Sequence, residues 1–464
     1  MKRFITYSEI RKSLAIGEIS SVELVANYLS QIKQKDKELN AFITVTDEYA
    51  YKKAKEIDRK IADNKNAFED FPLLGMVISL KDLYITKGIR TTAASNVLRD
   101  YVPQYSGTVV NRLEAAGAII IGKTNCDAWA HGASGENSDF GATKNPWNTE
   151  YVPGGSSSGS AASVAAEMSF AAMGTDTGGS IRQPASFCSV VGFKPTYGAV
   201  SRYGVVAMGS SLDCIGHFTH TVEDAERIFN VTAGADGHDG TIAYLKNNTS
   251  GTVSRVGIPK EYFAEGLDPE VRTIVEKAIK TLESDGVSVE EVSLPHTKYA
   301  ISVYYIVMPA EVSSNLGRYD GIRFGGERVS FGREARRRIM LGTYVLSSGY
   351  YDAYYLKAMK VRTKIIEDFS RVFEKVDALV APVSPTPAFK LGERTTDPLQ
   401  MYLADVYTVS GNLAGIPGLS VPAGFTSSGL PVGMQVLTPQ FHEGSLFSLG
   451  KRYQKLTNWH TKFA

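Results

Sequence analysis

A glycine- and serine-rich stretch between Val152 and Pro184 constrains this chain more than any other feature. It contains two Gly-Gly-Ser turns, which end at Ser156 and Ser180. A Gly/Ser tract is most simply a flexible linker, but the residues between the turns are alanine-rich over 161–166 and apolar over 170–173. Because glycine lets backbone N–H groups converge and ligands approach closely, the two turns predict a polar pocket instead.

The composition is typical of a globular protein with a large core. Apolar residues make up 43% and charged residues 21% of the 464 residues, which fits one large α/β domain or two or three average domains. A net charge of +1 gives no field that favours direct binding to nucleic acid or membranes. An RNA partner would therefore need a local basic patch or another subunit.

Cysteine usage and the N-terminal sequence indicate the compartment. Cys126, Cys188 and Cys214 are too few and too scattered for a disulfide framework, which favours a reducing compartment. The chain enters a structured-looking segment without a long apolar run or an Arg/Ser-rich presequence, so we expect a cytoplasmic protein. No window of about 18 uninterrupted apolar residues exists, and no membrane span is predicted.

Strand and helix patterns alternate along the chain. This alternation predicts an α/β fold, with a large mixed and mostly parallel sheet covered by helices on both faces. The predicted helices cover 20–32, 50–61, 108–116, 222–233, 268–284 and 443–456, and the predicted strands cover 41–45, 73–80, 118–122, 253–258, 287–292, 378–382, 418–422 and 432–437.

Lys81 directly follows the apolar run over 73–80. A lysine at this position can lie at a sheet edge with its ammonium in water. Alternatively it can be buried as a neutral amine that acts as a base, because desolvation lowers a lysine pKa. The residues alone leave both readings open.

Motifs typical of other catalytic sites are missing from the sequence, which favours a serine nucleophile with a lysine as its base. The seven histidines have no metal-ligand spacing, and no phosphate-loop pattern occurs. A Ser-His-Asp hydrolase stays open because such triads assemble in space, although a Gly-x-Ser-x-Gly elbow is missing. Ser180 is the better candidate nucleophile, since the Thr177-Gly178-Gly179 turn before it can aim N–H groups at an oxyanion.

The two glycine turns, at 154–160 and 174–184, together with Lys81-Asp82, resemble the motifs of the amidase signature family. The resemblance implies a single domain over 1–464, with a catalytic core at about 70–220 and a substrate-side region at about 300–420. It also implies that Lys81 is the base, Ser156 a bridging serine on a cis peptide bond, and Ser180 the nucleophile. The N–H groups of Thr177, Gly178, Gly179 and Ser180 would form the oxyanion hole.

Further segments resemble the branch of that family that serves as glutaminase subunits of tRNA-dependent amidotransferases. They lie at 136–138, 143–147, 194–198, 211–213, 319–321, 338–343, 349–355, 397–405 and 412–415. The resemblance implies glutamine hydrolysis and transfer of ammonia to a partner, within a heterotrimer with subunits B and C. The partner would use ATP and Mg²⁺ to convert Glu-tRNA(Gln) into Gln-tRNA(Gln), and this chain would need no cofactor or metal. Tyr305, Arg338 and Asp405 match the residues that bind glutamine.

The sequence departs from the family pattern at three places, and the second and third of them concern the predicted substrate rim. Ser158 replaces a usual glycine. Residues 126–136 differ from the usual Met-Asp-Glu-Phe-Ala-Met-Gly-Ser-Ser-Thr-Glu, and the segment between Phe324 and Phe331 is shorter than the usual helical insertion. Two alternative functions remain beside the glutaminase: a free-standing amidase for small carboxamides, and a non-catalytic assembly subunit.

Overall fold

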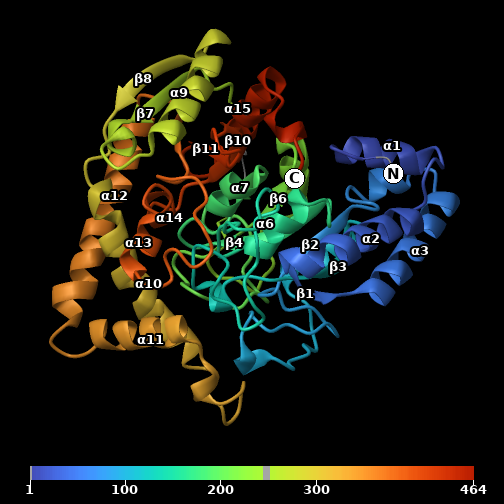
Figure 1. Ribbon diagram of the computed structural model, residues 1–464, viewed down its shortest axis with the longest axis horizontal. Helices are drawn as coiled ribbons and strands as arrows, with labels where there is room; N and C mark the ends of the chain where they lie inside the picture. Colours follow the sequence, from blue (N-terminus) through green and yellow to red (C-terminus); the bar gives the residue numbers. More distant parts are fainter. Residues whose placement is uncertain (1–2, 244–250) are drawn as a thin grey trace.

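A single eleven-stranded sheet runs through the computed structural model, which describes residues 3–243 and 251–464. In spatial order the strands are β1 (Phe42–Val45), β3 (Ile119–Thr124), β2 (Val77–Lys81), β4 (Ala171–Asp176), β6 (Cys214–Thr219), β5 (Val191–Lys194), β10 (Gly418–Phe425), β11 (Pro431–Leu437), β9 (Ala378–Pro382), β7 (Arg255–Pro259) and β8 (Ser288–Val292). One mixed sheet flanked by helices confirms the predicted α/β class (Figure 1).

The prediction of a mostly parallel sheet is wrong. Parallel pairs occur in two groups, β3–β2–β4 and β9–β7–β8. Every other neighbouring pair is antiparallel. For one of these pairs, β10 and β11, the physical reason is a tight turn over residues 426–430, closed by Thr426 and Leu430. A connection this short can join only antiparallel neighbours.

Helices cover both faces of the sheet. The helices are α1 (Tyr7–Ala15), α2 (Ser21–Leu39), α3 (Asp47–Asp63), α4 (Ala67–Asp70), α5 (Thr108–Ala115), α6 (Ser158–Ala165), α7 (Arg182–Cys188), α8 (Val222–Thr232), α9 (Pro269–Ser284), α10 (Ala300–Leu316), α11 (Arg333–Val345), α12 (Lys357–Phe373), α13 (Pro398–Leu403), α14 (Val409–Leu413) and α15 (Glu443–Leu456).

Two neighbours in β5 show which helices cover which face. Successive strand residues point to opposite faces. A Cβ on Gly192 would meet Ala185 of α7, whereas the Phe193 ring packs on Phe229 of α8 and Phe447 of α15. Helix α6 packs beside α7, and α9 packs beside α15. The centre of the sheet is therefore buried on both sides.

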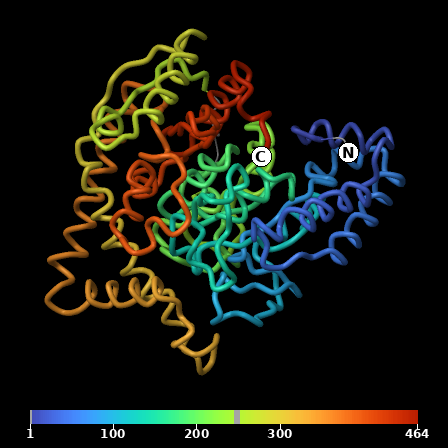
Figure 2. The backbone as a smooth tube through the Cα atoms, in the orientation of Figure 1, coloured from blue at the N-terminus to red at the C-terminus, as the bar shows by residue number. Residues whose placement is uncertain are grey.

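The ends of the sheet carry separate helical groups. Figure 2 shows the N-terminal helices on one flank, the segment containing α10 to α12 on the opposite flank, and the glycine-rich region between them. Within the described residues, no helix is long and apolar enough to cross a membrane.

Candidate active site

The parallel pairing of β2 with β4 places Lys81 beside the end of β4. Leu80 is opposite Met173 in this pair, and the carboxyl ends of parallel strands meet at the same end of a sheet. Ser156 and Ser157 lie directly before α6, which packs against both strands. The site therefore forms at the ends of β2 and β4, which are the third and fourth strands of the sheet.

Lys81 is fully buried among hydroxyl groups. Its Nζ lies 2.8 Å from Ser156 Oγ, 2.9 Å from Ser157 Oγ and 2.8 Å from Thr175 Oγ1. Burial lowers the pKa of the Lys81 ammonium to about 8, although nearby carboxylates oppose the shift. Of the two positions that the sequence left open for Lys81, the structure has the buried one, and this burial favours loss of the ammonium proton.

The hydrogen bonds around Lys81 determine how its amine is oriented once it is neutral. The Ser157 hydroxyl donates to the Thr175 carbonyl at 3.2 Å, so Ser157 Oγ can only accept from Lys81. A neutral amine has two N–H groups and one lone pair. In the structure Nζ donates to Ser156 Oγ as well. If a neutral Lys81 keeps its N–H groups on Ser157 and Thr175, its lone pair is left for Ser156, which lies on the cis Gly155–Ser156 peptide. This arrangement can take a proton from Ser156.

Ser180 lies in the turn between β4 and α7. It is 8% exposed, and its carbonyl accepts the Ser157 N–H at 3.2 Å, which ties the two glycine turns together. Thr177 Oγ1 donates to Asp213 at 2.7 Å and Thr408 Oγ1 donates to the Gly178 carbonyl at 2.6 Å. The turn is thus fixed from both sides.

The expected set of oxyanion donors differs from the structure at one position. The Gly179 N–H donates to Asp176 Oδ1 at 2.9 Å. Among the described residues, no hydrogen bond uses the N–H groups of Thr177, Gly178 and Ser180. Gly179 has φ +140°, and an added Cβ would collide with the Thr408 side chain. Its role is conformational, and the other three N–H groups are the available donors.

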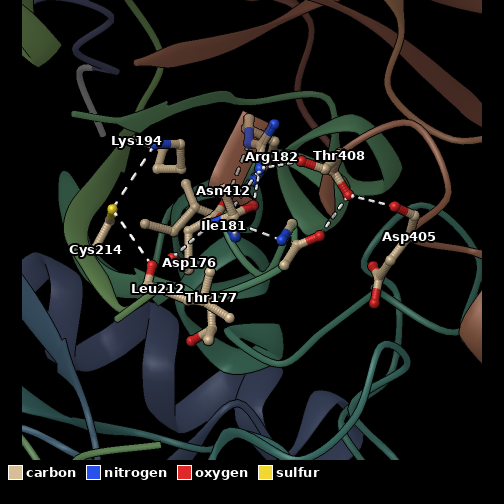
Figure 3. A network of polar contacts seen from close by, with 12 residues as sticks. Asp176, Thr177, Ile181, Arg182, Lys194, Leu212, Cys214, Asp405, Thr408 and Asn412 are labelled. Atoms are coloured by element: carbon tan, nitrogen blue, oxygen red, sulfur yellow. Dashed lines mark hydrogen bonds and ion pairs between the residues drawn. The ribbon is translucent and has the colours of Figure 1, made fainter. Parts of the chain in front are cut away.

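A buried ion pair supports this turn (Figure 3). Arg182 binds both carboxylate oxygens of Asp176 at 3.1 Å and donates to Asn412 Oδ1 at 2.6 Å. Asn412 in turn donates to Asp176 Oδ1 at 2.9 Å. Burial opposes ionisation, but the Arg182 guanidinium and these hydrogen bonds hold the pKa of Asp176 at about 2. A charged Asp176 can therefore anchor the Gly179 N–H.

A pocket of about 200 Å³ opens beside the site. Tyr305 and Arg338, two of the predicted substrate-binding residues, line it, together with Asp127, His131 and Tyr402. The wall of the pocket reaches the first glycine turn, because the Asp127 N–H donates to the Ser156 carbonyl at 3.1 Å. The lining is rich in arginines: Arg333, Arg337, Arg338 and Arg394.

Asp405, the third predicted substrate-binding residue, is buried but does not line this pocket. Its Oδ1 is 3.2 Å from the position that a Cβ on Gly179 would take. Within the described part of the chain this oxygen has no hydrogen-bond partner. Burial first, and then the Asp176 charge, raise the pKa of Asp405 well above its usual range. Tyr304 also approaches the turn, because a Cβ on Gly178 would meet its hydroxyl end.

Residues 23–447 of the chain match the family model for amidases. The chain belongs to the amidase family. A curated amidase-family relative, the A subunit of the glutamyl-tRNA(Gln) amidotransferase of Carboxydothermus hydrogenoformans, is 51% identical over 98% of each chain.

Solved structures of other amidase-family members show the same fold. The crystal structure of the A subunit of the glutamyl-tRNA(Gln) amidotransferase from Thermotoga maritima is 42% identical, with a TM-score of 0.81 over 96% of this chain and 94% of that chain. A bacterial aryl acylamidase of the amidase signature family is 25% identical, with a TM-score of 0.86 over 98% and 96% of the two chains.

Two departures from the amidase-family pattern compensate each other. Ser158 stands where the family usually has glycine, and Gly135 stands where it usually has threonine. Gly135 has φ +83°, and an added Cβ would lie 2.5 Å from Ser158 Cβ. The small residue at 135 thus makes room for the larger one at 158. The short 324–331 segment ends at Phe331, which packs on Trp129.

Sequence analysis did not identify Ser157, Thr175 or Asn412 as parts of this site. Ser157 lies in the same serine run as Ser156, and only the bond from its hydroxyl to the Thr175 carbonyl distinguishes the two serines. Asn412 lies in α14, 230 residues from its partner Arg182. No group of His, Cys, Asp and Glu side chains among residues 3–243 and 251–464 could hold a metal ion.

Proposed function

We propose that this chain is the glutamine-hydrolysing subunit of a tRNA-dependent amidotransferase. The observation that carries the proposal is the buried Lys81–Ser156 contact at 2.8 Å beside the Ser180 turn, in a chain that is 51% identical to the A subunit of a glutamyl-tRNA(Gln) amidotransferase. The catalytic core would lie at about 70–220 and the substrate-side region at about 300–420, with the protein in the cytoplasm.

The proposed reaction begins with proton transfer from Ser180 through Ser156 to Lys81. Ser180 Oγ attacks the γ-carbonyl carbon of glutamine, and the N–H groups of Thr177, Gly178 and Ser180 stabilise the oxyanion. Lys81 returns the proton through Ser156 to the leaving nitrogen. Ammonia departs and leaves a γ-glutamyl ester on Ser180. Water, deprotonated by the same relay, hydrolyses this ester to glutamate.

Glutamine would be held by its amino-acid head group. The Arg338 guanidinium suits the α-carboxylate, and the Asp405 carboxylate suits the α-ammonium. Asp405 supports this role because its Oδ1 lacks a partner among the described residues. An ammonium at this oxygen would lower the raised pKa of Asp405 again. Tyr305 would pack along the substrate from the pocket wall, where it stacks on Tyr402 at 3.8 Å.

The ammonia would serve a partner subunit. Ammonia alone does not amidate a carboxylate at a useful rate, so the partner must activate the glutamate of Glu-tRNA(Gln) with ATP and Mg²⁺. Subunits B and C would complete a heterotrimer. The net charge of +1 on this chain fits an arrangement in which the tRNA is bound mainly by the partner.

The test is to purify the complex with either wild-type chain or Ser180→Ala and to assay tRNA amidation with two nitrogen donors. With glutamine, the variant should lose activity, because no ammonia is released. With free ammonium chloride, wild type and variant should amidate Glu-tRNA(Gln) at equal rates. Glutamine-dependent amidation by Ser180→Ala at the wild-type rate would overturn the proposal.

A further inference from the structure

His131 is a fully buried imidazole on the wall of the substrate-side pocket. It is 0% exposed and lines the pocket together with Tyr305 and Arg338. Its backbone is fixed at both ends: the His131 N–H donates to the Ala128 carbonyl at 2.9 Å, and its carbonyl accepts from Asn137 Nδ2 at 2.7 Å. The ring is therefore held at the pocket by a rigid turn.

Neither ring nitrogen of His131 has a hydrogen-bond partner in the described part of the chain. Other buried histidines are paired: His217 Nε2 is 2.8 Å from the Ala225 carbonyl, and His220 Nε2 is 3.1 Å from the Val164 carbonyl. Burying an unpaired polar group costs stability. An unpaired imidazole on a pocket wall therefore indicates a ligand that pairs with it.

The protonation state of His131 limits what this ligand can be. Burial, and then the nearby Arg338 charge, lower the pKa of His131 well below its ordinary value. The ring is neutral, with one N–H donor and one acceptor nitrogen. The Arg338 guanidinium attracts an anionic ligand, and an anion accepts hydrogen bonds. The ring N–H of His131 is therefore the group that can bind it.

Arg338 is already partly occupied by the protein. Its Nε donates to Glu334 Oε1 at 2.9 Å, and its Nη1 is 3.4 Å from Met308 Sδ. A carboxylate has two oxygens with several acceptor sites. With part of the guanidinium fork used by Glu334, a bound carboxylate needs a second donor from the pocket wall.

We propose that His131 donates a ring N–H to the α-carboxylate of the substrate beside Arg338, and so determines specificity for amides that carry this carboxylate. The proposal rests on the proposed function, glutamine hydrolysis at Ser180. His131 does not touch the reacting atoms. It is a specificity-determining residue at a position where the family pattern has methionine.

The test compares wild type with His131→Met and His131→Gln in the full complex, using three ligands. The KM of glutamine is measured together with the inhibition constants of glutaramate, which lacks the ammonium, and of 4-aminobutanamide, which lacks the carboxylate. In His131→Met, the KM of glutamine and the constant for glutaramate should rise about tenfold, as expected for losing one charge-assisted hydrogen bond. The constant for 4-aminobutanamide and kcat should stay within about twofold.

His131→Gln keeps an N–H donor and should stay within about threefold of wild type for all three ligands. Equal changes for the three ligands in His131→Met, or no change, would overturn the proposal. A partly unfolded variant lowers kcat but does not produce a carboxylate-selective change in binding constants. If wild type does not hydrolyse glutamine, the proposed function itself fails. If the wild-type complex hydrolyses glutamine and His131→Met has the same KM and inhibition constants as wild type, only the role of His131 is refuted.

Discussion

At the scale of single residues, the protonation of Lys81 decides the chemistry. The amine is enclosed by the hydroxyl groups of Ser156, Ser157 and Thr175, and none of these three hydrogen-bond partners is a carboxylate. Desolvation favours its neutral form. A lysine in this setting can act as a base near neutral pH, whereas an exposed lysine cannot.

The pH dependence of glutamine hydrolysis follows from this pKa. The folded-state pKa of Lys81 is about 8, so below pH 8 the amine is mostly charged and cannot accept the serine proton. We expect kcat/KM for ammonia release to rise with pH and to reach half its plateau near the pKa of Lys81. Rates measured from pH 6 to pH 10 check this. A flat profile across that range would contradict a lysine base, and Lys81→Arg should be inactive because arginine stays charged.

Ser157 should orient Lys81 without entering the proton relay. Its hydroxyl accepts from Nζ at 2.9 Å and is itself directed to the Thr175 carbonyl. Ser157→Ala removes one of three hydrogen bonds, and kcat should fall about tenfold with KM unchanged. Ser163→Ala is the matched control, because Ser163 lies in α6, which begins directly after Ser157, and its hydroxyl bonds to Ser79 and Ser169. A loss for Ser157→Ala as complete as for Ser156→Ala would place Ser157 in the relay itself.

At the scale of elements, the catalytic turn depends on a contact between distant parts of the chain. Asp176 ends β4, Arg182 begins α7, and Asn412 of α14 bonds to both. The side chains of Asp176 and Arg182, which form an ion pair, are both fully buried. The ion pair therefore couples the conformation of the Ser180 turn to the docking of α14.

Breaking this pair on one side should strongly destabilise the protein. Arg182→Met leaves Asp176 buried without its counter-ion, and we expect a loss of about 3–5 kcal/mol in the free energy of unfolding. The double variant Asp176→Asn, Arg182→Met removes both charges and should recover part of this loss. Urea denaturation of the three proteins checks the order. An Arg182→Met protein as stable as wild type would show that the buried pair contributes nothing.

Sequence patterns predicted the helices and strands better than the directions in which the strands pair in the sheet. Strands and helices alternate as expected, and the capping box at Ser20 and Glu23 starts α2. The antiparallel centre of the sheet was not predicted, because side-chain periodicity is the same for both strand directions. The resemblance to the amidase signature family implied that Lys81, Ser156 and Ser180 act together. It could not show that the Gly179 N–H is used by Asp176, because that depends on the path of the turn in space.

At the scale of the whole molecule, the site combines segments from the entire chain. Lys81 comes from the end of β2, Ser156 and Ser180 from the two glycine turns, Arg338 from α11 and Asp405 from the segment before α14. Helices α10 and α11, which carry Tyr305 and Arg338, lie on the helical flank of Figure 1. Lys81 lies in β2 of the sheet, and Ser156 and Ser180 lie in the turns beside it. Substrate choice can therefore vary while the chemistry stays constant.

The alternative function, a free-standing amidase, is tested by substrate choice. The aryl acylamidase with a TM-score of 0.86 shows that this fold also occurs in amidases of another kind. We expect the complex to prefer glutamine over acetamide and propionamide by at least about a hundredfold in kcat/KM, because each lost head-group contact costs about tenfold. Ammonia release with each substrate is measured with and without the partner subunits. Partner-independent hydrolysis of simple amides at the glutamine rate would favour the free-standing amidase.

The central claim is that Ser180 attacks glutamine with Lys81 as the base. The most direct measurement is to mix the complex with glutamine, quench it in acid within milliseconds and map the digested chain by mass spectrometry. We expect a γ-glutamyl ester on the peptide that contains Ser180, and no such ester in Ser180→Ala or Lys81→Ala. A γ-glutamyl group on any other residue, or ammonia release without an acylated peptide, would contradict it.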